Sequence, residues 1–170
     1  MARAPLLQLS SVSLTFGGNP VFDDLSLTVQ PGDRVALVGR NGSGKSTLMK
    51  VMAGLVEPDH GSRTVPPGVT VGYMEQDPDL SRYATLGDFA ASNLPDGQEY
   101  RLAVVAEGLK FNPDTPVATA SGGERRRAAL AKLLAEAPEL MLLDEPTNHL
   151  DIQAIEWLER ELFETRTAFV

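Results

Sequence analysis

The sequence predicts an α/β fold with a mainly parallel core sheet, and three observations support this prediction. Short apolar segments alternate with helical segments along most of the chain. Two apolar segments, residues 34–38 and 139–143, are unbroken, as expected of strands that are buried on both faces. A glycine-rich loop stands between the first of these segments and a helical run. We expect a strand-rich N-terminal part and a helical middle part to be attached to this core.

The first half of the chain predicts mostly strands. Residues 6–16 and 21–29 alternate between apolar and polar side chains, and the turn sequence Gly-Gly-Asn-Pro separates them. Residues 48–55 predict a helix directly after the glycine-rich loop, and residues 69–76 predict a further strand. His60 lies in a turn sequence, and we expect it to be solvated.

The second half predicts helices around one more buried strand. Residues 85–93 and 98–110 have helical patterns, and the sequence Asn-Pro-Asp-Thr-Pro ends the second of them. Residues 121–137 are rich in Ala, Leu and Lys and predict a long helix that ends before Pro138. After the apolar segment 139–143, residues 151–163 place apolar side chains on one helical face, and residues 166–170 begin another strand.

Composition indicates one globular domain. The chain has 170 residues, of which 42% are hydrophobic, so it has enough apolar surface for a core. It has no signal peptide, no membrane-spanning run and no cysteine, and a cytoplasmic location fits best. The net charge of −8 is unlike that of a domain that grips nucleic acid, so such contact would need a local patch or segments outside this sequence.

The glycine-rich loop matches the phosphate-loop pattern G-x-x-x-x-G-K-[ST] at Gly39, Gly44, Lys45 and Ser46. Glycines let several backbone N–H groups point at one phosphate cluster, and the following helix adds its positive N-terminal end. We expect Lys45 to reach the β- and γ-phosphates and Ser46 to bind Mg²⁺. The alternative is a simple strand-to-helix turn. The other expected cofactor-binding residues of the loop are Asn41, Gly42, Ser43 and Thr47.

Asp144 and Glu145 end an apolar strand about a hundred residues after the loop. A buried carboxylate is costly without a partner, but it is favourable beside a metal ion. We expect Asp144 to hold Mg²⁺ and Glu145 to act as the general base that orients the attacking water. The alternative is an ordinary Asp-Glu-Pro turn. Phe16 could stack on a nucleotide base, although an aromatic residue at a strand end could equally be core.

The start of the helix 121–137 is unusual. Ser121 and Glu124 have the spacing of a capping box. That spacing does not explain Gly122 and Gly123, which disfavour helix, or the arginines 125–127 near the positive end of the helix dipole. Exposed N–H groups beside arginines suit an anion or an acidic neighbour. We therefore predict a second anion-binding helix start.

Together, the motifs GRNGSGKST, SGGE and LMLLDEP resemble the Walker A, signature and Walker B elements of the ABC ATPases. Gln76 resembles the Q-loop glutamine of that family, and Asp151 resembles its D-loop aspartate. The resemblance implies a P-loop NTPase (RecA-like) fold, bound ATP and Mg²⁺, and a catalytic and metal-binding role for Gln76. It also implies that two domains sandwich two ATP molecules head to tail, so that Ser121, Gly122 and Gly123 contact the γ-phosphate of ATP held by the partner domain. Asp151 is expected among the cofactor-binding residues.

The sequence DEPTNHLD is similar to the ABC-F subfamily, soluble proteins with two such domains that act on ribosomes, and several segments look most like its Uup-type branch. Ala120 departs mildly from the usual signature, and Glu124 replaces its common glutamine. About 45 residues separate Gln76 from Ser121, which leaves room for a helical subdomain but not for the long ABC-F arm. ATP is preferred over GTP by resemblance only.

The resemblance implies one C-terminally incomplete nucleotide-binding domain. We expect residues 1–78 to form the β subdomain with Walker A and the Q-loop, residues 79–118 a helical subdomain, and residues 119–170 the signature and Walker B part. The family's switch histidine is expected after a strand like residues 166–170, and neither His60 nor His149 occupies that position. A chain cut there would leave open sheet edges, so we expect a fragment that is inactive by itself.

Four hypotheses about the function remain. The first is a soluble ABC-F-type ATPase in which ATP closes paired domains on the ribosome. The second is the ATP-binding subunit of a membrane transporter, which shares every motif except TNHLD. A DNA-repair or chromosome-organising protein would need a long coiled coil, for which no heptad run is present. The fourth is a fragment that binds ATP without hydrolysing it.

Overall fold

The computed structural model describes residues 4–170, and the chain divides into two compact units. The first, which we call the sheet unit, contains the described residues up to Tyr73 together with Pro138–Asp144 and Arg166–Val170. The second, the helical unit, contains Met74–Ala137 and Glu145–Thr165. In the described part of the chain, no helix has both the length and the apolar character needed to cross a bilayer.

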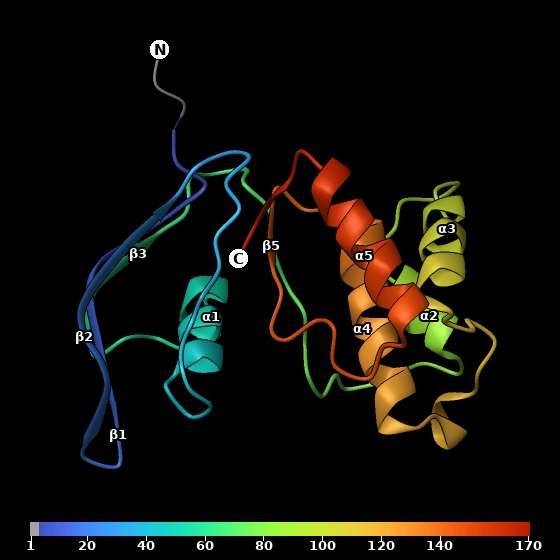
Figure 1. Ribbon diagram of the computed structural model, residues 1–170, viewed down its shortest axis with the longest axis horizontal. Coiled ribbons are helices and arrows are strands. Elements are labelled where there is room, and N and C mark those ends of the chain that lie inside the picture. The colour runs from blue at the N-terminus through green and yellow to red at the C-terminus, as the bar shows by residue number, and fades with distance from the viewer. Residues whose placement is uncertain (1–3) are drawn as a thin grey trace. The chain divides into compact units, whose positions relative to one another are not determined.

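The N-terminal part of the sheet unit is an antiparallel sheet with the order β2-β1-β3 (Figure 1). The two predicted strands are confirmed and form a hairpin: β1 (Leu7–Phe16) pairs with β2 (Asn19–Val29) across a two-glycine turn. The third strand, β3 (His60–Thr64), was not predicted, because the turn expected at His60 is instead the start of this strand. Its residues are mostly exposed and polar, so no apolar alternation marks it, and its main chain pairs with β1.

The second sheet of this unit is parallel, as predicted for the core. β4 (Val71–Tyr73) and β6 (Ala168–Phe169) flank β5 (Leu140–Leu142), and both pairings are parallel. All three residues of β5 are buried, as expected of a central strand. The strands predicted over residues 69–76, 139–143 and 166–170 therefore form, although each is shorter than its apolar pattern.

The strand predicted over residues 34–38 is wrong for most of its length. Arg34 makes a single parallel bridge with Phe169, and the Val35 N–H donates to the Phe169 carbonyl at 2.9 Å. Beyond Val35 the segment leaves the ladder, and Val38 is 94% exposed rather than buried. The physical reason is that a strand needs a neighbour along its length. Among the described residues the partner here is β6, which has two strand residues.

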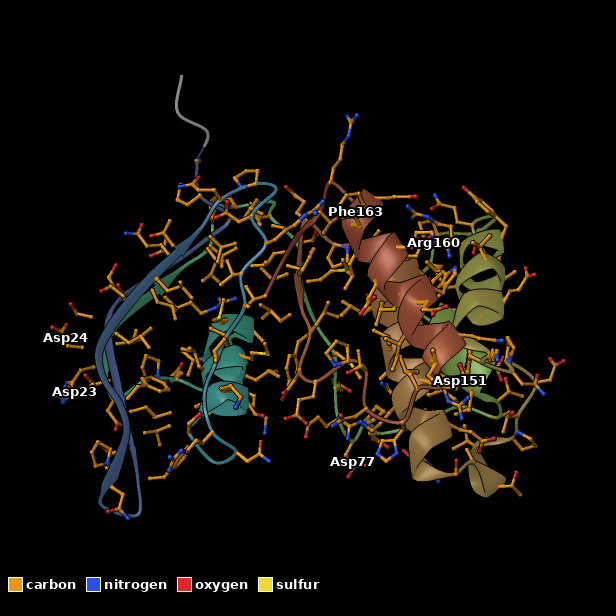
Figure 2. All side chains as sticks on the ribbon, in the orientation of Figure 1. Asp23, Asp24, Asp77, Asp151, Arg160 and Phe163 are labelled. Carbon is orange, nitrogen blue, oxygen red and sulfur yellow. The ribbon has the colours of Figure 1, made fainter. Side chains whose placement is uncertain are left out.

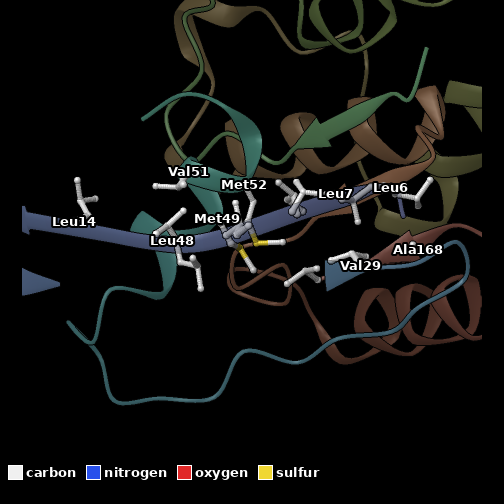
Figure 3. Packing of buried hydrophobic residues seen from close by; sticks show 14 residues of the cluster. Leu6, Leu7, Leu14, Val29, Leu48, Met49, Val51, Met52 and Ala168 are labelled. Atoms are coloured by element: carbon white, nitrogen blue, oxygen red, sulfur yellow. The ribbon is translucent and has the colours of Figure 1, made fainter. Parts of the chain in front are cut away.

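Helix α1 (Lys45–Ala53) supplies apolar side chains to the core of the sheet unit. Leu48, Met49, Val51 and Met52 are buried on this helix. They form one cluster with residues of β1, β2, β5 and β6, and Figure 3 shows the α1 side chains close to β1. Because α1 directly follows the glycine-rich loop, this packing fixes the end of the loop to the core.

The helical unit contains four α-helices and one 3₁₀ turn among its described residues (Figure 1). Helices α2 (Leu86–Ala91) and α3 (Tyr100–Leu109) both pack on α4 (Gly122–Glu136), and α5 (Ile152–Glu164) packs on α3. The 3₁₀ turn η1 (Val117–Thr119) precedes α4. The predicted helices are all present, within a few residues at their ends. The subdivision into residues 1–78, 79–118 and 119–170 stays a prediction.

Candidate functional site

The glycine-rich loop has local geometry that requires its glycines. Gly44 has a φ of 92°, in the left-handed region, and a Cβ there would lie 2.4 Å from Cγ1 of Val21. A Cβ on Gly39 would lie 2.5 Å from the Ser43 hydroxyl oxygen. Gly42 also has a positive φ, of 80°. Gly42 and Gly44 therefore adopt a backbone conformation that residues with a side chain rarely adopt, and Gly44 also lies too close to Val21 for a Cβ.

Lys45 is the first residue of α1, and its ammonium group turns back over the loop. Its Nζ donates to the Gly39 carbonyl and, at 3.2 Å, to the Arg40 carbonyl. Gly44, the N-cap residue of α1, supplies no side-chain hydrogen bond, and the first turn contains no acidic residue. The first turn of α1 therefore has no side-chain cap from Gly44 and no acidic residue of its own, which is an arrangement that favours a bound anion.

The other loop residues lie where the motif places them. Asn41, Gly42 and Ser43 form the turn before α1, and the Ser43 N–H donates to the Arg40 carbonyl at 3.0 Å. Ser46 and Thr47 are in the first turn of α1. Phe16, at the end of β1, is 54% exposed, so its ring is not part of the core and is accessible for stacking.

Among the described residues, Asp144 is the one buried residue with a charged or polar side chain, and 4% of its surface is exposed. It follows β5 and Leu143, whose N–H donates to the Val170 carbonyl at 2.8 Å. Burying a carboxylate is unfavourable unless it is paired or near a cation. Asp144 is therefore not part of an ordinary exposed turn, and its metal-binding role stays a prediction.

Glu145 differs from Asp144 in its exposure and in the unit to which it belongs. It is exposed and belongs to the helical unit, and its φ of 47° is rare for a residue with a side chain. Its Oε2 accepts a hydrogen bond from Nδ2 of Asn148 at 2.7 Å, and its carbonyl accepts from the Asn148 N–H at 3.2 Å. The adjacent carboxylates are thus held by different means, one by burial and one by a tight turn.

The start of α4 is the capping box that the spacing predicts. The Ser121 hydroxyl accepts from the Glu124 N–H at 3.2 Å, and the Glu124 carboxylate accepts from the Ser121 N–H at 2.7 Å. This second bond, from the backbone of Ser121, is the main cause that lowers the pKa of Glu124. A Cβ on Gly122 would meet no atom within 4 Å, and one on Gly123 would be in ordinary contact with His149. Gly122 is therefore not required by packing inside the described chain.

Two of the arginines that follow contact main-chain carbonyls, and the positive charge of Arg127 adds to the backbone hydrogen bonds that lower the pKa values of two acidic neighbours, Glu124 and Asp151. Arg125 donates to the carbonyls of Val117 and Ala120, and Arg127 donates to the Lys110 carbonyl at 3.3 Å. Lys110 is the C-cap residue of α3, where exposed carbonyls carry partial negative charge and attract cations. These two side chains therefore tie α4 to its neighbours through main-chain acceptors.

Asp151 is the N-cap of α5, as predicted from its position, and Figure 2 shows it at the start of that helix. One carboxylate oxygen accepts from the Ala154 N–H at 2.8 Å, and the other lies 3.0 Å from Nζ of Lys110. These two hydrogen bonds, the backbone one first, hold the pKa of Asp151 below its usual value. Gln76 lies in the exposed loop that follows β4.

The predicted site residues fall into two sets. The sheet unit carries Phe16, the loop 39–47 and Asp144, and the helical unit carries Gln76, Glu145, the residues 121–123 and Asp151. Two contact residues were missed by sequence reasoning. Asn148 is three residues from Glu145, a spacing at which a side chain can reach back across a turn. Lys110 lies 41 residues from Asp151, so no local pattern could have found it.

Three predicted metal ligands are oxygen donors: the Ser46 hydroxyl, the Asp144 carboxylate and the Gln76 amide. Among the described residues, no cluster of three or more His, Cys, Asp or Glu side chains could hold a metal by itself. That is compatible with Mg²⁺, which is usually bound through one or two carboxylates together with waters and substrate phosphates. The donor chemistry and the buried Asp144 therefore fit Mg²⁺ delivered with a nucleotide.

Comparison with known proteins identifies one matching family and several similar ATP-binding proteins. Residues 22–148 match the ABC transporter family. The chain is 49% identical to the ATP-binding protein Uup of Caulobacter vibrioides over 168 residues, which is 98% of this chain and 27% of that protein. It is 33% identical to the energy-dependent translational throttle protein EttA of Mycobacterium tuberculosis, covering 91% of this chain and 35% of that protein. The chain thus spans about a quarter to a third of these relatives.

Transporter proteins match as well. The zinc import ATP-binding protein ZnuC of Pseudomonas fluorescens is 38% identical over 150 residues, which is 86% of this chain and 58% of that protein. A solved structure of the ATP-binding subunit of an ABC transporter superposes with a TM-score of 0.80 at 27% identity, covering 95% of this chain and 75% of the other. The family match and the similarity to Uup and EttA agree with the motifs, and the chain belongs to the ABC transporter family of ATP-binding domains.

Proposed function

We propose that this domain binds and hydrolyses Mg-ATP as one half of an ATP-gated pair of nucleotide-binding domains. The observation that carries this proposal is that the chain has two glycine-containing helix starts, at α1 and at α4, in different units. The start of α1 is uncapped by side chains and suits the phosphates of the domain's own nucleotide. The start of α4 has an open Gly122, which the described chain does not fill.

The loop residues have defined roles in this proposal. Backbone N–H groups in the first turn of α1 cradle the phosphates, and Lys45 moves its ammonium from the loop carbonyls to the β- and γ-phosphate oxygens. Ser46, Asp144 and Gln76 would hold Mg²⁺, which supplies charge neutralisation on those oxygens. The exposed ring of Phe16 stacks on the base. Stacking of this kind does not read the identity of the base, so the preference for ATP over GTP rests on resemblance alone.

Glu145 acts as the general base. It accepts a proton from water while the water oxygen attacks the γ-phosphorus and the bond to the β-phosphate oxygen breaks, which gives ADP and phosphate. Its exposure and its carboxylate, held by one hydrogen bond from Asn148, leave the second oxygen, Oε1, for the water. Ser121, Gly122 and Gly123 contact the γ-phosphate of ATP on the partner domain, and Asp151 lies at the same interface. In this proposal, the closing of the two domains around ATP is the conformational change that acts on the partner.

We place the parent protein in translation on the ribosome, in the cytoplasm. The support is the TNHLD sequence and the similarity to EttA, which is named as a translational throttle protein. A second function, the ATP-binding subunit of a membrane transporter, is favoured by the 38% identity to ZnuC, a zinc import ATP-binding protein. The two differ in their partner and share the ATP chemistry.

The test uses the full-length protein that carries Glu145→Gln, which should trap the ATP-closed state. ATP is added to a cell lysate, and the lysate is sedimented on a sucrose gradient. Co-migration with ribosomes that is lost without ATP would support the translation function. Migration with membranes would favour the transporter subunit. Protein that stays at the top of the gradient in both conditions would contradict both partners.

A further inference from the structure

The turn that begins at Glu145 has an internal hydrogen bond with consequences for catalysis. Asn148 donates from Nδ2 to Oε2 of Glu145 at 2.7 Å, a short distance that is typical of a bond to a charged acceptor. An ionised carboxylate can only accept, so the amide must present its NH₂ group here. The bond therefore fixes which carboxylate oxygen is occupied and which remains available.

The backbone of the same turn is conformationally unfavourable. Glu145 has a φ of 47° and His149 a φ of 65°, both rare for residues that are not glycine. Glu145 also precedes Pro146, whose ring restricts the backbone of the residue before it. Such conformations persist only when surrounding contacts hold them. The two bonds between Asn148 and Glu145, one from the side chain and one from the backbone, are such contacts.

The far end of the turn lies against the signature residues of the same unit. A Cβ on Gly123 would lie 3.5 Å from Cβ of His149 and 3.8 Å from its Cγ. Leu150 closes the turn with a backbone bond to the Thr147 carbonyl at 3.2 Å. The C-terminal end of the turn, at His149 and Leu150, is therefore held by contacts, while the side chain of Glu145 at its start is exposed. An exposed carboxylate on a flexible side chain needs such a local bond to keep one orientation.

We infer that Asn148 is a positioning residue for Glu145, which directs Oε1 of the carboxylate toward the attacking water. This inference rests on the proposed function of Glu145 as the general base. Asn148 itself takes no proton, because an amide does not titrate in this range. Removing it leaves the base in place but lets its carboxylate rotate, so the fraction of time in the reactive orientation falls.

The test measures ATP turnover of the full-length protein with four variants: Asn148→Ala, Asn148→Asp, Glu145→Gln and the double variant. Asn148→Ala should lower kcat by about ten- to a hundredfold and leave the KM for ATP unchanged. The rate of Glu145→Gln gives the ATP turnover that remains without the proposed base. Asn148→Ala should not lower that rate further in the double variant. Thr147→Ala, an exposed change in the same turn, is the matched control and should keep the wild-type rate.

Rescue by a conservative variant separates positioning from a merely structural role. Asn148→Asp removes the amide donor and places a second carboxylate beside Glu145, so it should lower kcat at least as much as Asn148→Ala. Asn148→Gln retains the amide donor and should recover part of the rate. If Asn148→Ala keeps the wild-type kcat while Glu145→Gln is inactive, the inference fails and the proposed base survives. If Glu145→Gln itself turns over normally, the proposed function of Glu145 fails.

Discussion

Lys110 and Asp151 form an ion pair across 41 residues of sequence, with Nζ of Lys110 3.0 Å from a carboxylate oxygen of Asp151. Lys110 is the C-cap residue of α3 and has a φ of 52°, and its carbonyl accepts from Arg127 of α4. Asp151 caps α5. One residue at the end of α3 therefore contacts side chains of α4 and of the residue that begins α5.

Lys110→Met should raise the pKa of Asp151 toward its ordinary value of 3.8, because the Lys110 hydrogen bond is one of the causes that lower it. The backbone bond from Ala154 remains, so the rise should be partial. NMR titration of the carboxyl carbon measures it. Lys110→Arg, which keeps the charge and a donor, should leave the pKa low. An unchanged pKa in Lys110→Met would mean that the pair does not persist in solution. About half of each side chain is exposed, so we expect little effect on stability.

The stability of the helical unit should fall in acid. Asp79, Glu124 and Asp151 all have pKa values below their ordinary ones, chiefly because each carboxylate accepts a backbone N–H bond. A lowered folded-state pKa gives stability that is fully present above the unfolded-state value and is lost as pH falls through the folded-state value. The melting temperature should therefore drop below about pH 4.5, the ordinary value for Glu124. Glu124→Gln should show a shallower drop, and an identical slope would contradict this explanation.

Gly108→Ala should disrupt the packing of α3 on α5. A Cβ there would lie 2.0 Å from Cε2 of Trp157, so the ring or the helix must move. Overpacking of this kind typically costs about 1–3 kcal/mol. Trp157 is the one tryptophan of the sequence, so its fluorescence reports the change directly. Val104→Ala, at an exposed position of the same helix, is the control and should leave the spectrum unchanged.

Gly122→Ala should leave the protein stable but reduce its ATP turnover. A Cβ at this position meets no atom within 4 Å, and Ala is favoured over Gly in a helix, so thermal stability should stay the same or rise slightly. If the start of α4 contacts the nucleotide of a partner domain, the added methyl group should reduce ATP turnover at least tenfold in the full-length protein. Normal turnover in a stable Gly122→Ala variant would argue against that contact.

Lys45→Met should abolish nucleotide binding without unfolding the sheet unit. The Lys45 ammonium donates to carbonyls of the loop, and the buried face of α1 is formed by other residues. Binding of a fluorescent ATP analogue measures the loss, and circular dichroism checks the fold. Lys50→Met, an exposed change in the last turn of α1, controls for the removal of one positive charge. Retained binding in Lys45→Met would contradict the phosphate-loop role.

Much of the candidate site could be predicted from the sequence because its helix caps and glycine turns depend on neighbouring residues. The capping box of Ser121 and Glu124, the cap by Asp151 and the glycine geometry of the loop each depend on residues within one or two turns of chain. Backbone geometry at that range follows from the residue types themselves. The apolar run before Asp144 predicts the buried strand β5, whereas the burial of Asp144 itself depends on packing.

Tertiary structure alone decided the rest. β3 carries no apolar pattern and forms because its main chain meets β1, and the predicted strand 34–38 is lost where β6 no longer pairs with it. Lys110 reaches Asp151, and Trp157 covers Gly108, only because α3 packs on α5. These contacts depend on the packing of distant segments against one another, which a pattern within a single segment does not encode. The sequence determined which groups are present and how each segment folds, and packing decided which of those groups meet.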